Sequence, residues 1–135
     1  MMSKLADNWL LFILRPLFII TERPVIAYGL TVMVAAAIIC LSLSPLEALP
    51  PAPGSDKLHH FMAYGALAMP LSFIYARHLR WYLISFILLG GLIELVQPFV
   101  NRYGEWADFG ANMAGVMLGY IGARIIFKGM QRLAM

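Results

Sequence analysis

The chain has 135 residues, of which 61% are hydrophobic and 13% charged, and its mean hydropathy is +0.78. This composition excludes an ordinary soluble domain, because stretches of nearly twenty residues carry almost no charge and leave no polar face. The net charge of +3 does not indicate nucleic-acid binding, because the basic residues form no run or stripe and lie mostly beside apolar segments. The lone Cys40 cannot form an intrachain disulfide and is interpreted as a small apolar residue.

The first 24 residues are predicted to form an N-terminal cytoplasmic and interfacial segment. Residues 5–20 are apolar, but Asp7, Arg15 and Pro16 leave only about a dozen continuous apolar residues, too few to span a bilayer. We therefore expect an interfacial amphipathic helix here. A signal peptide is disfavoured, because Arg15 interrupts the apolar run and no A-x-A cleavage site follows it. A fifth, tilted span is the alternative.

Four later segments are each long enough to cross a hydrocarbon core of roughly 30 Å at about 1.5 Å per residue. They are residues 25–43, 58–76, 81–97 and 107–127. Because the connections between them are short, neighbouring helices should run antiparallel. The predicted fold is all-α, an integral membrane four-helix transmembrane bundle that forms one membrane domain over residues 25–128. Residues 129–135 are predicted to be a short cytoplasmic tail.

The Lys and Arg residues predict the orientation of this bundle, because cytoplasmic loops are enriched in them. If the N-terminus is cytoplasmic, only Lys57 and Arg102 of the ten basic residues lie on the outer side. The cytoplasmic side then holds Lys4, Arg15, Arg23, Arg77, Arg80, Arg124, Lys128 and Arg132. The chain is thus predicted to be a multi-pass membrane protein with both termini in the cytoplasm.

The second span begins with polar residues on one face. Asp56, His60 and Tyr64 follow one another at intervals of four residues, which places them along one side of a helix, with Lys57 adjacent at its mouth. Two simpler interpretations stay open. In the first, Asp56, which follows Ser55, is part of a helix cap and has no other role. In the second, His60 hydrogen-bonds a neighbouring carboxylate and has no other role.

The third span ends with Glu94 and Gln97 on one face, just before Pro98. Glu94 lies about one turn below the predicted outer surface, where a carboxylate is costly unless it faces the bundle interior and finds a partner. We expect Lys57 or Arg102 to be that partner. The alternative is a structural ion pair that only locks two helices together.

The last segment carries one stripe that is polar at its outer end and small at its inner end. Arg102, Glu105 and Asp108 recur every third residue. The stripe continues through Asn112, Gly115 and Gly119. Gly115 and Gly119 form a small-xxx-small pair that indicates close helix packing, for which Gly90 and Gly91 of the third span offer a matching surface.

Together these segments predict a polar pocket that faces outward. Its candidate ligand-binding residues are Asp56, Lys57, His60, Tyr64, Glu94, Gln97, Arg102, Glu105, Asp108 and Asn112. Lysine and arginine beside amides and acids suit an anionic headgroup. Glu94, His60 and Asp108 are also candidates for acid/base catalysis.

Other chemistries have less support in the sequence. No P-loop, GxGxxG or Ser-His-Asp order is present. A metal site built from Asp56, His60, Glu94 and Asp108 is chemically reasonable, but no HExxH or Cys/His spacing supports it. We therefore expect neither a metal nor a cofactor.

Three motifs in order resemble the VanZ-like family: Asp56-Lys57-x-x-His60-Phe61-x-x-Tyr64, Glu94-x-x-Gln97, and Arg102-x-x-Glu105-x-x-Asp108-x-x-x-Asn112-x-x-Gly115-x-x-x-Gly119. The resemblance covers residues 55–119. Members of this family are small bacterial membrane proteins, and the founding member is associated with low-level teicoplanin resistance. The resemblance implies a bacterial cytoplasmic (inner) membrane, a role in the cell envelope and a link to glycopeptide susceptibility, but it implies no reaction.

The leading hypothesis is therefore a protein that binds or handles an anionic lipid or lipid-linked envelope precursor through its headgroup. One alternative is a membrane-embedded acid/base hydrolase or transferase that acts on a lipid-linked substrate. Another is a structural partner protein in which the polar residues only lock the bundle. The expected partners are membrane lipids and not nucleic acid, and homo-oligomerisation stays open.

Overall fold

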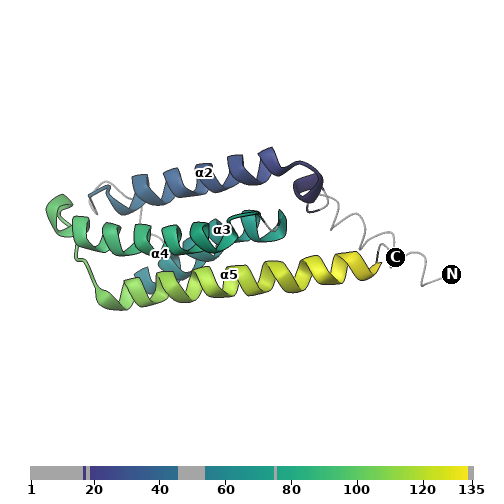
Figure 1. The fold of residues 1–135 in the computed structure, drawn as a ribbon. Coiled ribbons are helices and arrows are strands. Elements are labelled where there is room, and N and C mark those ends of the chain that lie inside the picture. The colour runs from purple at the N-terminus through teal and green to yellow at the C-terminus, as the bar shows by residue number, and fades with distance from the viewer. Residues whose placement is uncertain (1–16, 18, 46–53, 75, 134–135) are drawn as a thin grey trace.

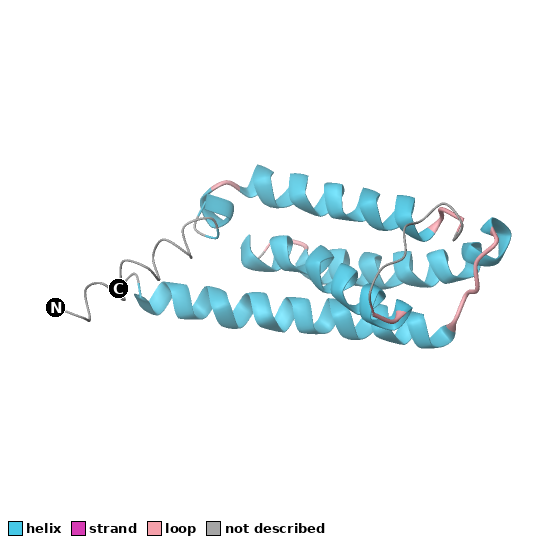
Figure 2. Cartoon of the chain, turned by 180° about the vertical axis from the view of Figure 1, so that it is seen from behind, coloured by secondary structure: helices cyan, strands magenta, loops and turns pink. Residues whose placement is uncertain are grey.

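The computed structural model describes residue 17 and residues 19–45, 54–74 and 76–133. Four long helices lie in this part of the chain: α2 (Pro24–Ser42), α3 (Asp56–Ile74), α4 (Leu79–Val96) and α5 (Trp106–Leu133). A short 3-10 helix, η2 (Gln97–Val100), continues directly from α4. The described residues contain no strand (Figure 2). The predicted all-α fold is confirmed.

The helix boundaries follow from local chemistry. Pro24 occupies the first turn of α2, where its missing N–H costs nothing. Ser55 precedes α3, and its Oγ accepts a hydrogen bond from the backbone N–H of Leu58 at 3.3 Å. α5 continues to Leu133, with Arg132 in its last turn, so most of the predicted tail is helical. The predicted interfacial helix lies almost entirely outside the described residues.

Three of the helical segments are long and apolar enough to cross a membrane: Pro24–Ser42, Leu79–Val100 and Trp106–Arg132. Large apolar side chains on these segments lie exposed on the outside, among them Val25, Leu88, Leu92 and Ile125. Exposed apolar surface on this scale suits a lipid environment and not water. These features support a membrane protein with transmembrane helices.

α3 is the inner helix of the molecule. Figure 1 shows α3 and α4 between α2 and α5, and α3 makes its most extensive contacts with α5. Tyr64, Leu67 and Leu71 of α3 are almost completely buried, and Val116 of α5 is fully buried with them. Because consecutive helices run antiparallel, α3 and α5 run in the same direction and begin at the same end.

Glycines allow α3 and α5 to approach closely. A Cβ at Gly115 would overlap the backbone carbonyl oxygen of Phe61, and a Cβ at Gly119 would overlap that of Gly65. The pair therefore packs against α3 and not against the glycines of α4, which meet other α5 side chains: Gly90 lies against Asn112 and Gly91 against Phe109. This close approach sets the register between the polar ends of α3 and α5.

Candidate functional site

The candidate site lies where α2 and α4 end and α3 and α5 begin, at the left of Figure 1. The antiparallel order of the helices collects polar residues from separate segments at this end. The predicted ligand-binding residues lie at or just below it: Asp56, Lys57, His60, Tyr64, Glu94, Gln97, Arg102, Glu105, Asp108 and Asn112.

Three titratable side chains form the buried centre of the site. His60 of α3, Glu94 of α4 and Asp108 of α5 are 8%, 6% and 4% exposed. One nitrogen or oxygen atom from each lies within 4.8 Å of the others. His60 Nδ1 is 3.8 Å from Glu94 Oε1, and His60 Nε2 is 4.0 Å from Asp108 Oδ2. We call these three residues the buried triad.

Asn112 fixes the orientation of the His60 ring. The Asn112 side chain is completely buried, and its Oδ1 lies 3.0 Å from His60 Nδ1. A carbonyl oxygen can only accept a hydrogen bond, so Nδ1 carries the proton and donates. Nε2 therefore faces the Asp108 carboxylate. The amide thus sets both the tilt of the ring and which nitrogen is directed at Asp108.

The Glu94 carboxylate is held on one side by the segment that precedes α5. Its Oε2 accepts a hydrogen bond from the backbone N–H of Glu105 at 3.1 Å. Gly104 permits this approach, because a Cβ there would overlap the backbone carbonyl oxygen of Glu94. Glu94 Oε1 has no hydrogen-bond partner among the residues that the structure describes. One oxygen is therefore fixed, and the other faces His60.

The expectation that Lys57 or Arg102 pairs with Glu94 is wrong. Lys57 Nζ lies 2.8 Å from Glu105 Oε2 and 3.5 Å from Asp108 Oδ1, because α3 and α5 begin side by side. Arg102 Nη1 donates instead to the backbone carbonyl oxygens of Leu41, at 2.9 Å, and Ser44, at 3.4 Å. These carbonyls at the end of α2 lack partners within the helix, so they attract the guanidinium.

Lys57 lies at the exposed rim of the site. Its side chain is 51% exposed. The hydrogen bond to Glu105, together with the negative charge of Asp108, raises the pKa of the Lys57 ammonium above its ordinary value. Lys57 is therefore cationic at neutral pH and presents its charge to the surface beside the buried triad.

The other predicted residues surround the buried triad at different depths. Gln97 is buried, and its Nε2 donates to the backbone carbonyl oxygen of Ser42 at 3.3 Å, which links η2 to α2. Tyr64 is completely buried beneath the site. The Asp56 side chain is 67% exposed and lies 3.9 Å from His59 Nδ1, so it belongs to the rim and not to the centre.

Two openings lead to the buried triad. A polar cleft of about 60 Å³ is lined by Asp56, His60, Gln97, Arg102, Tyr103, Glu105 and Asp108. A less polar groove of about 200 Å³ is lined by Glu94, Leu95, Pro98, Gly104, Glu105 and Trp106. The site is therefore accessible from a charged side and from a largely apolar side.

Sequence reasoning missed the aromatic residues at this end. Phe99, Tyr103 and Trp106 are 87%, 85% and 78% exposed, and the last two line the openings. Aromatic residues concentrate where a membrane meets water, so their clustering within 99–106 could have drawn attention to this segment. Gly104 was also missed, since its role depends on a contact with α4.

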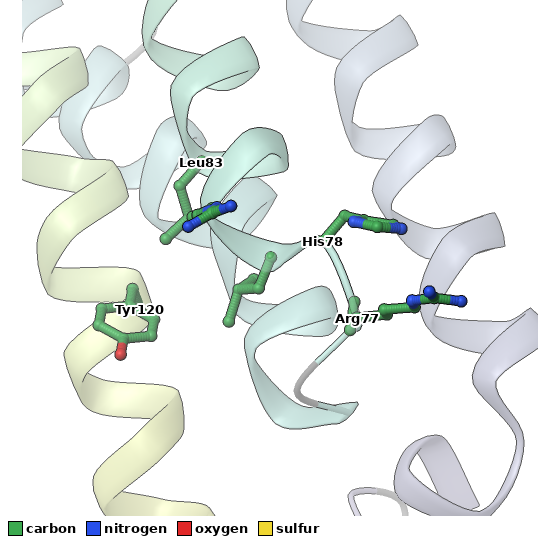
Figure 3. A pocket seen from close by; sticks show the side chains of 7 residues that line it. Arg77, His78, Leu83 and Tyr120 are labelled. Carbon is green, nitrogen blue, oxygen red and sulfur yellow. The ribbon is translucent and has the colours of Figure 1, made fainter.

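A larger hollow of about 460 Å³ lies at the opposite end of α3 and α4. Its lining residues are Ala76, Arg77, His78, Leu79, Arg80, Leu83 and Tyr120. Figure 3 shows that Arg77 and His78 extend away from Tyr120. Arg77, His78 and Arg80 lie where α3 is joined to α4, and the described lining of this hollow contains no acid.

Comparison with family models, with curated proteins and with solved structures finds no match for this chain. The resemblance to the VanZ-like family therefore remains a prediction that rests on the motifs alone. What the structure defines is a helical protein with apolar outer surfaces and a buried triad at one end.

Proposed function

We propose that this chain crosses the bacterial inner membrane four times. Residues 58–74 of α3 form one span, in addition to the three apolar segments described above. α3 is as long as α2, with 19 residues each, but His60 and its other polar residues lower its hydropathy. Those residues are tolerated because α3 is enclosed by its neighbours. Asp56 and Lys57 then lie at the outer surface, and both termini lie in the cytoplasm.

We further propose that the site binds an anionic headgroup of a membrane lipid or of a lipid-linked envelope precursor. The observation that carries this proposal is the position of the buried triad between a charged cleft and a less polar groove. An amphiphilic ligand suits this arrangement, because its charged group can enter the cleft beside Arg102, with Lys57 at the rim, while its chain lies against Leu95 and Trp106. The motifs of the VanZ-like family agree with such an envelope role, including an effect on glycopeptide susceptibility.

The volume of the cleft limits what can enter it. About 60 Å³ is room for a few water-sized groups, since one such group needs about 10–15 Å³. By size, only a compact group such as a single phosphate therefore fits the cleft, where Arg102 is the cation in the lining, and a sugar or peptide attached to it stays outside. The proposed ligand class is a lipid that carries a terminal or linking phosphate.

The buried triad also supports the enzymatic alternative, a hydrolase or transferase that acts on the same lipid-linked phosphate. His60 is held by Asn112, and Glu94 by the backbone of Glu105, so both groups are positioned before any ligand arrives. Preorganised acid and base groups at the end of a cleft are typical of catalytic sites.

Lipid co-purification tests the proposed binding. The full chain is purified in native-lipid nanodiscs, and bound lipids are measured by mass spectrometry for wild type, Lys57→Ala and Arg102→Gln. We expect phosphate-bearing lipids to be enriched in wild type and reduced severalfold in both variants, because each variant removes a cation beside the cleft. Lys128→Ala, which removes a cation from the opposite end, is the matched control and should retain wild-type lipids.

Two results would contradict the binding proposal. One is the same lipid content in all four proteins. The other is a lower melting temperature in Lys57→Ala and Arg102→Gln with unchanged lipids, which would support the structural alternative in which the polar residues only lock the bundle.

A further inference from the structure

We propose that the buried triad binds a divalent transition-metal cation, with Zn²⁺ as the leading ion. The three side chains supply one imidazole nitrogen and two carboxylate oxygens, all within 4.8 Å of one another. Zinc binds both imidazole nitrogens and carboxylate oxygens, and zinc sites that retain an open position use three protein ligands. The binding of the ion is inferred from the geometry alone. The role of the ion rests on the proposed function.

The charge of the buried triad is the first argument. Glu94 and Asp108 are both more than nine-tenths buried, and two carboxylates close together are costly without positive charge. Lys57 reaches Asp108 only from the rim, and no Lys or Arg side chain in the described ranges forms an ion pair with Glu94. A divalent cation among the three side chains would balance both carboxylates.

The hydrogen-bonding state of His60 is the second argument. Because Nδ1 donates to Asn112, a neutral ring has its lone pair on Nε2, and this lone pair faces Asp108 Oδ2 at 4.0 Å. That separation is too long for a hydrogen bond. A metal ion resolves the conflict, since it accepts the lone pair and the carboxylate together. Metal-bound histidines usually donate their other ring N–H in the way that His60 does.

The unpaired oxygen of Glu94 is the third argument. Oε1 is buried, lacks a hydrogen-bond partner in the described part of the chain, and lies 3.8 Å from His60 Nδ1, on the side of the ring that donates to Asn112. Ligand atoms around one tetrahedral zinc are about 3.4 Å apart, given bonds of about 2.0–2.2 Å. The three groups offer ligand atoms within 4.8 Å of one another, so side-chain shifts of about one ångström are required, and the Glu94 carboxylate must turn from Nδ1 toward Nε2 to reach the same ion.

The cleft connects the ion to the surface and to the proposed lipid headgroup. His60 and Asp108 line the cleft directly, so an ion held by them has an open coordination position on that side. A phosphate oxygen of the proposed lipid headgroup is a suitable fourth ligand, and the ion would then polarise that phosphate. The chemical class of the ion follows from the imidazole, because Ca²⁺ and Mg²⁺ prefer all-oxygen sites.

Direct metal binding tests the inference without any lipid. The full chain is purified in detergent with a tag that contains no histidine, stripped with EDTA, and titrated with Zn²⁺ and separately with Mn²⁺ by calorimetry. We expect one Zn²⁺ ion per chain, confirmed by elemental analysis after gel filtration. His60→Ala, Glu94→Gln and Asp108→Asn should each lose this stoichiometric ion, and Asn112→Ala should bind it about 10–100-fold more weakly.

The matched control is His59, the neighbouring residue of the same helix, whose side chain is 41% exposed. The variant His59→Ala should retain one ion per chain. Retention of the ion by His60→Ala, or its loss only in His59→Ala, would overturn the inference. So would a wild-type protein that binds no Zn²⁺ or Mn²⁺ above background.

Co²⁺ loading keeps the inference testable if the triad variants do not fold. Wild-type protein with Co²⁺ should show visible absorption typical of four- or five-coordinate cobalt, and Zn²⁺ should abolish it. Absence of this absorption would contradict the site.

Lipid co-purification with EDTA-treated protein separates the two proposals. Zinc binding without enrichment of phosphate-bearing lipids rejects only the lipid function, and lipid enrichment without zinc binding rejects only the ion.

Discussion

At the scale of single residues, the most consequential contact is the hydrogen bond between His60 and Asn112. It joins α3 to α5 across 52 positions of sequence, in the buried centre of the site. Both residues were candidates from the stripes of polar residues on their helices. Their direct contact could not be predicted, because it depends on the rotation of α5 about its own axis, and the stripe gives only an approximate direction.

Replacement of Asn112 by alanine should destabilise the protein by about 1–3 kcal/mol, because it removes a fully buried hydrogen-bonding partner and leaves His60 Nδ1 without an acceptor. Thermal unfolding in detergent, followed by tryptophan fluorescence, measures the change. Met113→Ala is the control, since Met113 is the next residue and is 41% exposed. An equal effect of both substitutions would argue against the buried hydrogen bond.

The ionic contacts also show that the sequence predicts which residues gather at one end but not which of them pair. The sequence placed Lys57, Arg102 and Glu94 at one end but paired them incorrectly. Lys57 binds Glu105, and Arg102 binds backbone carbonyls of α2. Backbone carbonyl groups at a helix end are present whatever the residue types are, so a residue pattern does not show them. That Arg102 would bind them could be seen only in the three-dimensional structure.

At the scale of elements, the crossing of α3 and α5 brings His60 close to Asp108. Gly115 and Gly119 were predicted as packing residues from their spacing alone. The partner surface, Phe61 and Gly65, was not predicted, because a lone glycine in α3 forms no pattern. The backbones can approach only where neither helix has a side chain in the way.

Gly119→Ala should separate α3 from α5, because its Cβ would overlap the Gly65 carbonyl oxygen. We expect a loss of stability of about 1–3 kcal/mol, the usual cost of overpacking. The matched control is Gly122→Ala on the same helix, where a Cβ meets nothing within 4 Å and should be neutral or slightly stabilising. Melting temperatures in detergent make the comparison. A stable Gly119→Ala protein with an unstable Gly122→Ala protein would contradict this packing.

At the scale of the whole molecule, the antiparallel order of the helices is what assembles the site. Short connections in the sequence predicted this order, and the structure has α3 and α5 beginning at one end beside the end of α4. The count of Lys and Arg predicts that this end faces outward, which the fold by itself does not reveal. The orientation of the bundle in the membrane is therefore predicted from the sequence alone, and an experiment on intact cells tests it.

Reporter fusions after Arg80 and after the C-terminus should both give a cytoplasmic signal in living bacteria, because the basic residues concentrate there. A fusion after Tyr103 should give an external signal, since it follows the segment that carries Arg102 alone. Paired alkaline phosphatase and fluorescent protein fusions measure the two sides. An external signal after Arg80 would invert the orientation and place the proposed site in the cytoplasm.

The sequence by itself determined the helical class, the approximate bounds of the long helices and the residues that gather at one end. Apolar length and the spacing of polar residues along a helix are local properties, so they can be read from the chain. Only the tertiary structure decided that His60, Glu94 and Asp108 form the buried centre while Asp56 and Lys57 stay at the rim. Depth and pairing depend on which faces of separate helices meet, and that is settled by the packing of glycines and buried side chains between them.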